Sequence, residues 1–201
     1  MPFSPEKFFD FTAFDHRPLF DGRDLVWEAL SDLKRYVLTL SLGKIECDIP
    51  LGVTLVNPSL ISIGKGCVVY PGSYIEGPCV IGCESEVRFG AFIRPYVLCG
   101  RGCVLGHGCE VKESILFEGV KLSHFNYVGN SILGNGVNFG AGAVCANQRL
   151  DKKEVAVKKV KTGLTKLGAI VGDKSQVGCN CVLNPGTCLL PKSACLPCGG
   201  L

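Results

Sequence analysis

The sequence predicts an all-β protein whose chain winds into a single-stranded parallel β-helix. An aliphatic residue or cysteine recurs every six residues, and a small or short side chain follows four places later. The first position holds Ile63, Val69, Ile75, Ile81, Val87, Ile93, Cys99, Leu105 and Val111. In such a solenoid three hexads make one triangular coil, the aliphatic side chain fills the interior, and glycine in the second place eases the turn.

The composition agrees with one turn-rich domain. The chain has 201 residues, of which 26 are glycine, with 47% hydrophobic and 19% charged residues, as expected for an all-β protein that buries most of its aliphatic side chains. A net charge of +3 is too small to indicate binding to nucleic acid or to a membrane surface. No cationic segment followed by an apolar run opens the chain and no stretch approaches about 18 apolar residues, so we expect a cytoplasmic protein without a membrane span.

Most of the 13 cysteines fall into hexad positions. The small position holds Cys67, Cys79, Cys103, Cys109 and Cys181, and the aliphatic position holds Cys99 and Cys195. A free cysteine acts there as a small buried hydrophobe, and an odd total without a secretion signal argues against a disulfide framework. Cys195 and Cys198 form the one Cys-x-x-Cys, with no second pair at zinc-finger spacing, so we expect no metal site.

Residues 1 to about 23 carry clustered phenylalanines and predict an extended arm that covers an apolar surface. From Asp24 to Leu40 the apolar residues follow helical spacing, with Gly43 just past the end. We expect this helix to plug the first coil and to keep its edge from pairing with another chain. Residues 1–44 would thus be an arm and capping helix ahead of a β-helix domain of residues 45–201.

The hexads are interrupted in three regions of the β-helix: the first coil, a region with two slips of phase, and an insertion. They are imperfect from residue 45 to 62, where we place the first coil, since terminal repeats are often atypical. After Val111 the phase slips by one residue, and a second slip follows before Leu133. Two five-residue sides in succession should distort the coil, and departures from a local rule often mark function.

The third interruption is an insertion at residues 145–166, which is rich in lysine. A long non-repeating loop on a rigid solenoid is a candidate binding element. The alternative is a solvated basic hairpin without a binding role. The hexads resume at Val171.

Stacking of the coils places cations next to one another. Residues eighteen apart in an unslipped region lie about 4.8 Å apart, as neighbouring strands do. Arg94 and Lys112 are such a pair, and two cations repel unless an anion such as phosphate lies between them. The alternative is an ordinary surface pair of Glu76 with Arg94, with Lys112 left in solvent.

The slipped region places a histidine next to a run of small residues. Across a five-residue side the coil has seventeen residues, which sets His124 beside Ala141 in the run from Gly140 to Ala143. A candidate base next to an uncovered backbone is how an acyl-transfer site could be built, because the imidazole accepts a proton and a backbone N–H receives the oxyanion.

Several segments together carry a family resemblance. They are Arg94-Pro95, Glu110 to Lys112, Ser123 to Gly129, Val137 to Gly142, Ala146-Asn147, Asn-x-Arg-x-Asp-x-Lys from Asn147 to Lys153, and Lys-Leu-Gly at 166–168. In these the chain resembles the acetyltransferase half of the bifunctional N-acetylglucosamine-1-phosphate uridyltransferase/glucosamine-1-phosphate acetyltransferases, and especially the archaeal-type sugar-phosphate nucleotidylyltransferases. The resemblance covers roughly residues 45–195 and implies a left-handed β-helix.

The resemblance also implies an activity and a role for each matching residue. Arg94 and Lys112 would hold a sugar phosphate, and His124 would be the general base. The other implied site residues are Tyr127, Asn138, Asn147 and Lys153 for the amino sugar, and Ala141 and Cys179 at the border of acetyl-coenzyme A. The amine of glucosamine-1-phosphate would attack the thioester, without a metal, in a homotrimer with a site at each subunit boundary. Such a reaction belongs to UDP-N-acetylglucosamine synthesis.

The chain also departs from the family. Gln148-Arg149 stand where the bacterial form has Tyr-Asp, and no Gly-rich phosphate loop opens an α/β unit. We therefore expect no nucleotidyltransferase activity from this chain alone and a separate protein for uridylation.

Three alternatives remain open at this point. The first is a non-catalytic trimeric scaffold that pairs with a separate nucleotidyltransferase. The second is a hexapeptide acyltransferase with another acceptor or a longer acyl chain. The third is a carbonic-anhydrase relative, which would need three zinc-binding histidines, and His16, His107 and His124 offer no closely spaced pair.

Overall fold

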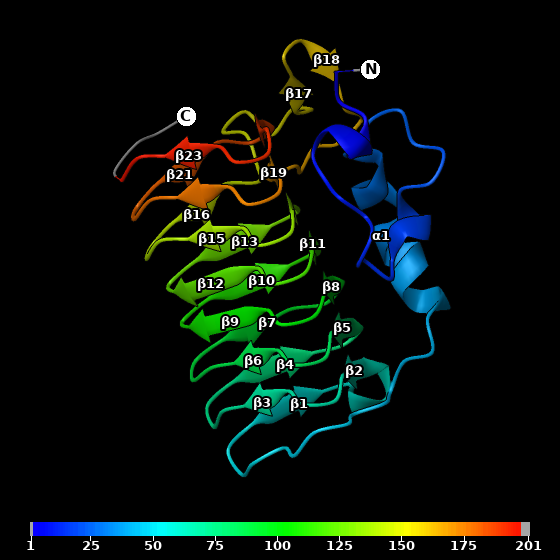
Figure 1. The fold of residues 1–201 in the computed structure, drawn as a ribbon, viewed down its shortest axis with the longest axis vertical. Helices are drawn as coiled ribbons and strands as arrows, with labels where there is room; N and C mark the ends of the chain where they lie inside the picture. Colours follow the sequence, from blue (N-terminus) through cyan, green and yellow to red (C-terminus); the bar gives the residue numbers. More distant parts are fainter. Residues whose placement is uncertain (1, 198–201) are drawn as a thin grey trace.

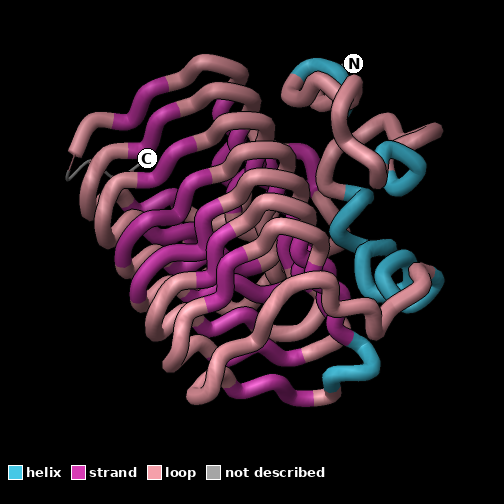
Figure 2. The backbone as a smooth tube through the Cα atoms, turned by 60° about the horizontal axis from the view of Figure 1, so that its bottom comes forward, coloured by secondary structure: helices cyan, strands magenta, loops and turns pink. Residues whose placement is uncertain are grey.

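The computed structural model describes residues 2–197 and shows the chain as a stack of triangular coils (Figures 1 and 2). Three seven-stranded parallel sheets form the three sides, and each coil contributes one strand to each sheet in turn. The prediction of a parallel β-helix is therefore confirmed. Among residues 2–197, no helix is long and apolar enough to cross a lipid bilayer.

We name the three sheets A, B and C. Sheet A contains β2 (Ile61–Ile63), β5 (Cys79–Ile81), β8 (Val97–Cys99), β11 (Ser114–Leu116), β14 (Ile132–Leu133), β19 (Ala169–Val171) and β22 (Thr187–Leu189). Sheet B contains β1 (Thr54–Val56), β4 (Tyr74–Glu76), β7 (Phe92–Ile93), β10 (Glu110–Lys112), β13 (Tyr127–Gly129), β16 (Val144–Cys145) and β21 (Val182–Leu183). Sheet C contains β3 (Val68–Val69), β6 (Glu86–Val87), β9 (Val104–His107), β12 (Lys121–His124), β15 (Asn138–Phe139), β20 (Gln176–Val177) and β23 (Ala194–Cys195).

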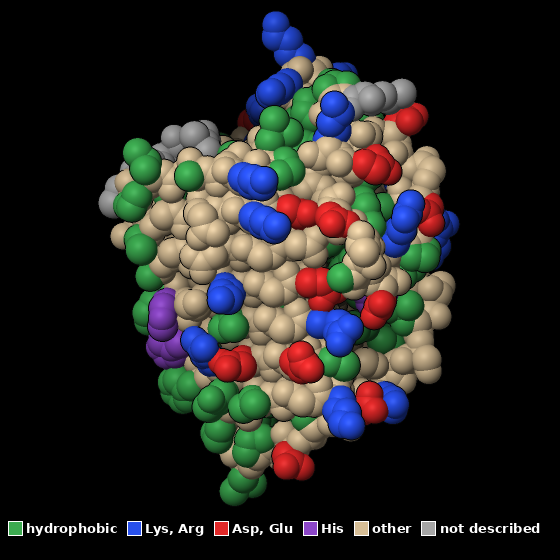
Figure 3. Space-filling view, viewed as in Figure 1, with side chains coloured by type: hydrophobic (Ala, Val, Ile, Leu, Met, Phe, Trp, Pro, Cys, Tyr) green, Lys and Arg blue, Asp and Glu red, His purple; other side chains and the backbone are tan. Residues whose placement is uncertain are grey.

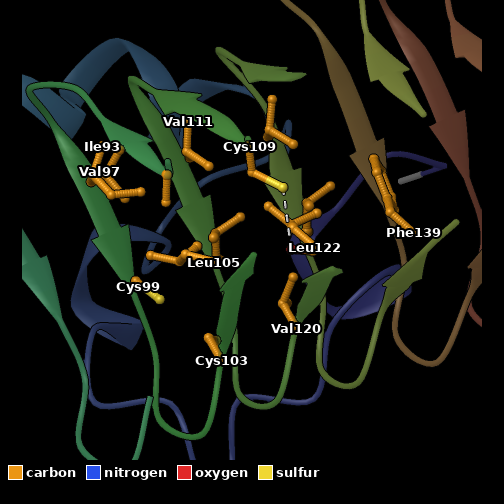
Figure 4. Close-up of a cluster of buried hydrophobic side chains, with 14 of the residues drawn as sticks. Ile93, Val97, Cys99, Cys103, Leu105, Cys109, Val111, Val120, Leu122 and Phe139 are labelled. Carbon is orange, nitrogen blue, oxygen red and sulfur yellow. Dashed lines mark hydrogen bonds between the residues drawn. The ribbon is translucent and has the colours of Figure 1, made fainter. Parts of the chain in front are cut away.

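The interior of the coils is a continuous apolar core, part of which Figure 4 shows. The predicted aliphatic positions between Ile63 and Val111 point into it and are buried, and so are the cysteines expected at the small position. The described cysteines are free thiols, and burial raises the pKa of Cys79 to about 12, so this buried thiol acts as a packing group. Cys195 is partly buried, and Cys198 lies outside the described residues.

The register of the strands confirms the interruptions. Ile45 bridges to Ile63, which places the first coil where the sequence predicted it. Most early neighbours are eighteen residues apart, as Ile75 and Ile93 are, whereas Val111 pairs with Val128 and Leu116 with Leu133. These shorter intervals are the seventeen-residue coils that the two slips predicted. The left-handed sense of the β-helix, which the resemblance implies, stays a prediction.

The N-terminal segments cover the outer face of sheet A. They comprise η1 (Pro5–Lys7), η2 (Arg17–Leu19) and α1 (Glu28–Thr39), while η3 (Pro58–Leu60) precedes β2. The outward-facing Leu98, Ile115 and Ile132 are fully buried in one cluster with the phenylalanines of the arm. A sheet buried on both faces needs continuous apolar strands, which explains why β8, β11 and β19 are buried at each residue.

The helix exists as predicted but begins later than Asp24, and the expectation that it plugs the first coil is wrong. It contacts β11 in the middle of sheet A, and Figure 1 shows it beside the stack rather than across its end. The reason is that Ala29, Leu33 and Val37 form an apolar stripe that matches the apolar outer row of the sheet.

The insertion folds as a hairpin of β17 (Ala156–Val157) and β18 (Val160–Lys161). Val155, Val157 and Leu167 join the cluster that covers sheet A, whereas the lysines at the tip are exposed. The insertion is therefore a basic hairpin that is anchored to the protein by its apolar side. A binding role for it stays a prediction.

Phe117 packs the arm against the β-helix, and replacing it should weaken that contact. Its ring is fully buried and stacks on Phe14 at 3.9 Å and on Phe9 at 4.6 Å between ring centroids. Phe117→Ala should lower the free energy of unfolding by about 3–5 kcal/mol, measured by urea unfolding, and should speed proteolysis of the arm. Phe89→Ala is the control, because Phe89 is 60% exposed. Equal effects of the two variants would contradict this assignment.

Candidate active site

The outer face of sheet B carries the predicted pair of cations. Ile93 pairs with Val111, and the Arg94 N–H donates to the Val111 carbonyl at 2.9 Å, so Arg94 and Lys112 are neighbours as expected. Arg94 Nη1 lies 2.8 Å from Glu110 Oε1. The partner of Arg94 is thus Glu110 and not Glu76. Among the ion pairs within residues 2–197, none includes the half-buried Lys112.

A third cation approaches from the insertion. The pKa of Lys112 is lowered by burial and by the positive charges of Lys166 and Arg94. Lys166 is exposed on the segment that returns from the hairpin. The sequence placed Lys166 in the basic insertion and in a family motif, but its approach to Lys112 was not predicted, because the repeat does not fix the path of an insertion. The carboxylates of Glu113 and Glu110 act on Lys112 in the opposite sense, and an anion site at these cations stays a prediction.

Two predicted polar residues lie beside these cations. Tyr127 pairs with Glu110 in the register of sheet B, and its hydroxyl donates to Asn147 Oδ1 at 3.5 Å. Burial and the charge of Glu110 raise the pKa of Tyr127, against a lowering by Arg94, so the phenol remains a hydrogen-bond donor at neutral pH. Sheet B therefore brings together Arg94, Lys112, Tyr127 and Asn147.

His124 lies at the corner where sheet C turns into sheet B. It pairs with His107 below it, and its carbonyl accepts the Gly142 N–H at 3.0 Å, which confirms its expected position beside Ala141. The next coil places Cys179 beside Ala141, whose carbonyl accepts the Asn180 N–H at 2.9 Å. The His124 side chain is exposed. Figure 3 shows histidine side chains gathered at one edge of the molecule, next to hydrophobic ones.

The sequence reasoning missed Asn126, which fixes this corner. Its side chain is buried, and its Nδ2 donates to the carbonyls of Gly140 at 2.8 Å and Ala143 at 3.3 Å, while its Oδ1 accepts the His124 N–H at 3.3 Å. Phe125 between them has a left-handed φ of 53°. The sequence could have singled out Asn126, because it is an asparagine in a position where the neighbouring coils hold Cys109 and Ala143.

Two predicted site residues lie apart from both the cations on sheet B and His124. Asn138 lies on the outer face of sheet C between Lys121 and Gln176. Lys153 is exposed on the insertion, where its N–H donates to Asp151 Oδ1 at 3.1 Å. Their roles in binding stay predictions. Within residues 2–197 no group of three or more His, Cys, Asp or Glu side chains could hold a metal ion.

Lys112 ends its strand of sheet B next to the corner with sheet A, whereas His124 ends its strand of sheet C at the corner with sheet B. In the register of the sheet Lys112 stands at the level of Gly129, five residues beyond His124 in the next coil. The chain between them turns at Phe125, whose φ of 53° is left-handed, so it spans less than the ~15 Å of five fully extended residues. Lys112 and His124 therefore lie on strands of different sheets.

The chain is similar to several known proteins. Residues 75–195 match the family model of the GMPPB C-terminal domain. The bifunctional sugar-1-phosphate nucleotidylyltransferase/acetyltransferase of Sulfurisphaera tokodaii is 37% identical over 158 residues, which cover 77% of this chain and 38% of that protein. The bifunctional protein GlmU of Methanococcus maripaludis is 37% identical over 164 residues, which cover 80% and 39%. The chain thus spans about two fifths of the length of these curated relatives.

Among solved structures, a putative acetyltransferase of Bacillus cereus aligns with a TM-score of 0.56 at 16% identity. The alignment covers 71% of this chain and 76% of that one. At this identity the likeness shows the fold alone.

Inorganic phosphate should stabilise the folded protein, because it relieves the repulsion among Arg94, Lys112 and Lys166. The lowered pKa of Lys112 means that its charged form is penalised in the folded state, and this penalty is fully present at neutral pH. The melting temperature should therefore rise with phosphate concentration, and Lys112→Met should lose most of that rise. Lys65→Met, at an exposed lysine of an early coil, is the control. An equal phosphate response in both variants would contradict an anion site at Lys112.

Proposed function

The chain belongs to the GMPPB C-terminal domain family, and from this premise we propose that it is an acetyltransferase that uses acetyl-coenzyme A. Its acceptor is an amino-sugar 1-phosphate, with glucosamine-1-phosphate as the first candidate. The observation that carries the proposal is the presence of two groups beside sheet B, Arg94 and Lys112 with the nearby Lys166, and His124 at the corner with sheet C. The similar protein of Sulfurisphaera tokodaii is a bifunctional sugar-1-phosphate nucleotidylyltransferase/acetyltransferase, which supports the same reaction class.

The cation group fits the phosphate of the acceptor. Arg94 supplies a planar guanidinium that can bind two phosphate oxygens, and its present partner is Glu110 at 2.8 Å. Lys112 and Lys166 supply two further charges from neighbouring positions. Tyr127 and Asn147 offer a hydroxyl and an amide next to these charges, which suits the hydroxyl groups of a sugar ring.

His124 fits the role of general base. The amine nitrogen of the acceptor attacks the thioester carbonyl, and His124 takes the proton that the nitrogen loses. The tetrahedral intermediate then expels coenzyme A as a thiolate, which is protonated to the free thiol. Histidine is the side chain that most often serves as a general base in enzymes. Ala141 and Cys179 stand in the same column, and their short side chains leave room for the pantetheine arm.

The positions of the two groups support a site at a subunit boundary. In a hexosamine 1-phosphate the amino group and the phosphate are attached to neighbouring ring carbons. In one chain Lys112 is in register with Gly129, five residues beyond His124, and the two residues lie on strands of different sheets, which supports a site that a second subunit completes. A cyclic homotrimer in which His124 of one subunit faces Arg94 and Lys112 of the next would form such a site.

The proposal is tested by measuring the thiol released from acetyl-coenzyme A. We expect turnover with glucosamine-1-phosphate and none with unphosphorylated glucosamine. His124→Ala should lower kcat by about 100-fold or more, the usual contribution of a general base. His107→Ala is the matched control, since His107 lies one coil below and its Nδ1 is 2.8 Å from the Phe89 carbonyl oxygen. Full activity of His124→Ala would contradict the mechanism, and silence of a folded trimer with both sugars would favour a scaffold.

A further inference from the structure

A chain of polar side chains links α1 to the acceptor side of the site. It runs along the corner between sheets B and A. Lys34 Nζ lies 3.1 Å from Glu113 Oε2, and Asn130 Nδ2 donates to the same oxygen at 3.1 Å. Asn147 Nδ2 donates to Asn130 Oδ1 at 2.6 Å, and the Tyr127 hydroxyl donates to Asn147 Oδ1 at 3.5 Å. Glu113, Asn130 and Asn147 thus occupy one corner in three consecutive coils.

The carboxylate decides the direction of each hydrogen bond in this chain. An ionised Glu113 can only accept, so Asn130 must turn its amide nitrogen towards Glu113 and its oxygen towards Asn147. Asn147 must then donate with its nitrogen, which leaves its Oδ1 facing Tyr127. The reverse orientation of either amide would bring two acceptors or two donors together.

Two features keep the carboxylate charged and in place. Burial by itself would raise the pKa of Glu113, but the hydrogen bond and charge of Lys34, with the hydrogen bond of Asn130, lower it on balance. Both Glu113 and Asn130 have a left-handed φ, of 43° and 48°, so the corner backbone aims the two side chains along the stack. Asn130 is 8% exposed, and its amide therefore has little access to water as an alternative partner.

We propose that Lys34, Glu113 and Asn130 are positioning residues that present Asn147 Oδ1, as an acceptor, to the amino sugar. This inference rests on the proposed function, in which Tyr127 and Asn147 bind the acceptor. A cavity of about 300 Å³ between α1 and the return of the insertion is lined by Lys34, Glu113, Asn130 and Lys166, among others. The positioning chain is thus a wall of the space next to the cation group, and α1 contributes to the site as well as to stability.

Glu113→Gln tests the proposal, because the amide keeps the size of the side chain and loses its acceptor-only character. The KM for glucosamine-1-phosphate should rise by about tenfold, the cost of one misdirected hydrogen bond, while the KM for acetyl-coenzyme A stays unchanged. Lys34→Met should also raise the KM for glucosamine-1-phosphate. Lys34→Arg keeps the positive charge and should leave this KM at the wild-type value. The matched control is Glu118→Gln, a partly buried carboxylate that accepts the Arg101 N–H at the corner between sheets A and C.

A second readout does not depend on turnover. The side-chain amide signals of Asn130 and Asn147, measured by NMR without ligands and assigned with Asn147→Asp, should shift in Glu113→Gln and remain in place in Glu118→Gln. Unchanged signals, or a wild-type acceptor KM in Glu113→Gln, would overturn the proposal. If the wild-type protein acetylates no amino-sugar phosphate, the proposed function fails, and the amide signals still decide whether Glu113 directs Asn147.

Discussion

The stacking of one coil upon the next fixes where the polar groups of the site lie. Ile93, Val111 and Val128 are fully buried neighbours within sheet B, and the outward residues that flank them are held in columns at the spacing of parallel strands. Burial of the aliphatic side chains stabilises the stack. The same stack therefore keeps Arg94 and Lys112 side by side although their charges repel.

The repeat made much of this predictable. Counting eighteen residues placed Arg94 next to Lys112, and counting seventeen placed His124 next to Ala141, because a parallel ladder allows no other register once the interior positions are known. The position of α1 was not predictable, since the stripe of Leu33 and Val37 fits any apolar surface. The approach of Lys166 to Lys112 depends on the path of an insertion without a repeat, and the Arg94–Glu110 pair depends on the reach of a side chain.

The covering of sheet A decides which faces of the β-helix the N-terminal segments leave open. Sheet A is occupied by the arm and α1, so Arg94 and Lys112 on sheet B and His124 at the corner with sheet C lie outside the surface that these segments cover. The corner between sheets A and B connects the two regions, because Glu113 contacts both Lys34 of α1 and Asn130 beside the acceptor residues. The N-terminal segment thus packs on the β-helix and, through Lys34, contacts the corner that carries Glu113.

The most direct test of this account is the activity of mixed trimers. Subunits with His124→Ala and subunits with both Arg94→Ala and Lys112→Ala should each be inactive alone, and they are mixed in equal amounts, unfolded and refolded together. If each site uses His124 of one subunit and the cations of the next, each mixed trimer contains one intact site, and about a quarter of the wild-type activity should return. No recovery from trimers shown to be mixed would contradict a site shared between subunits.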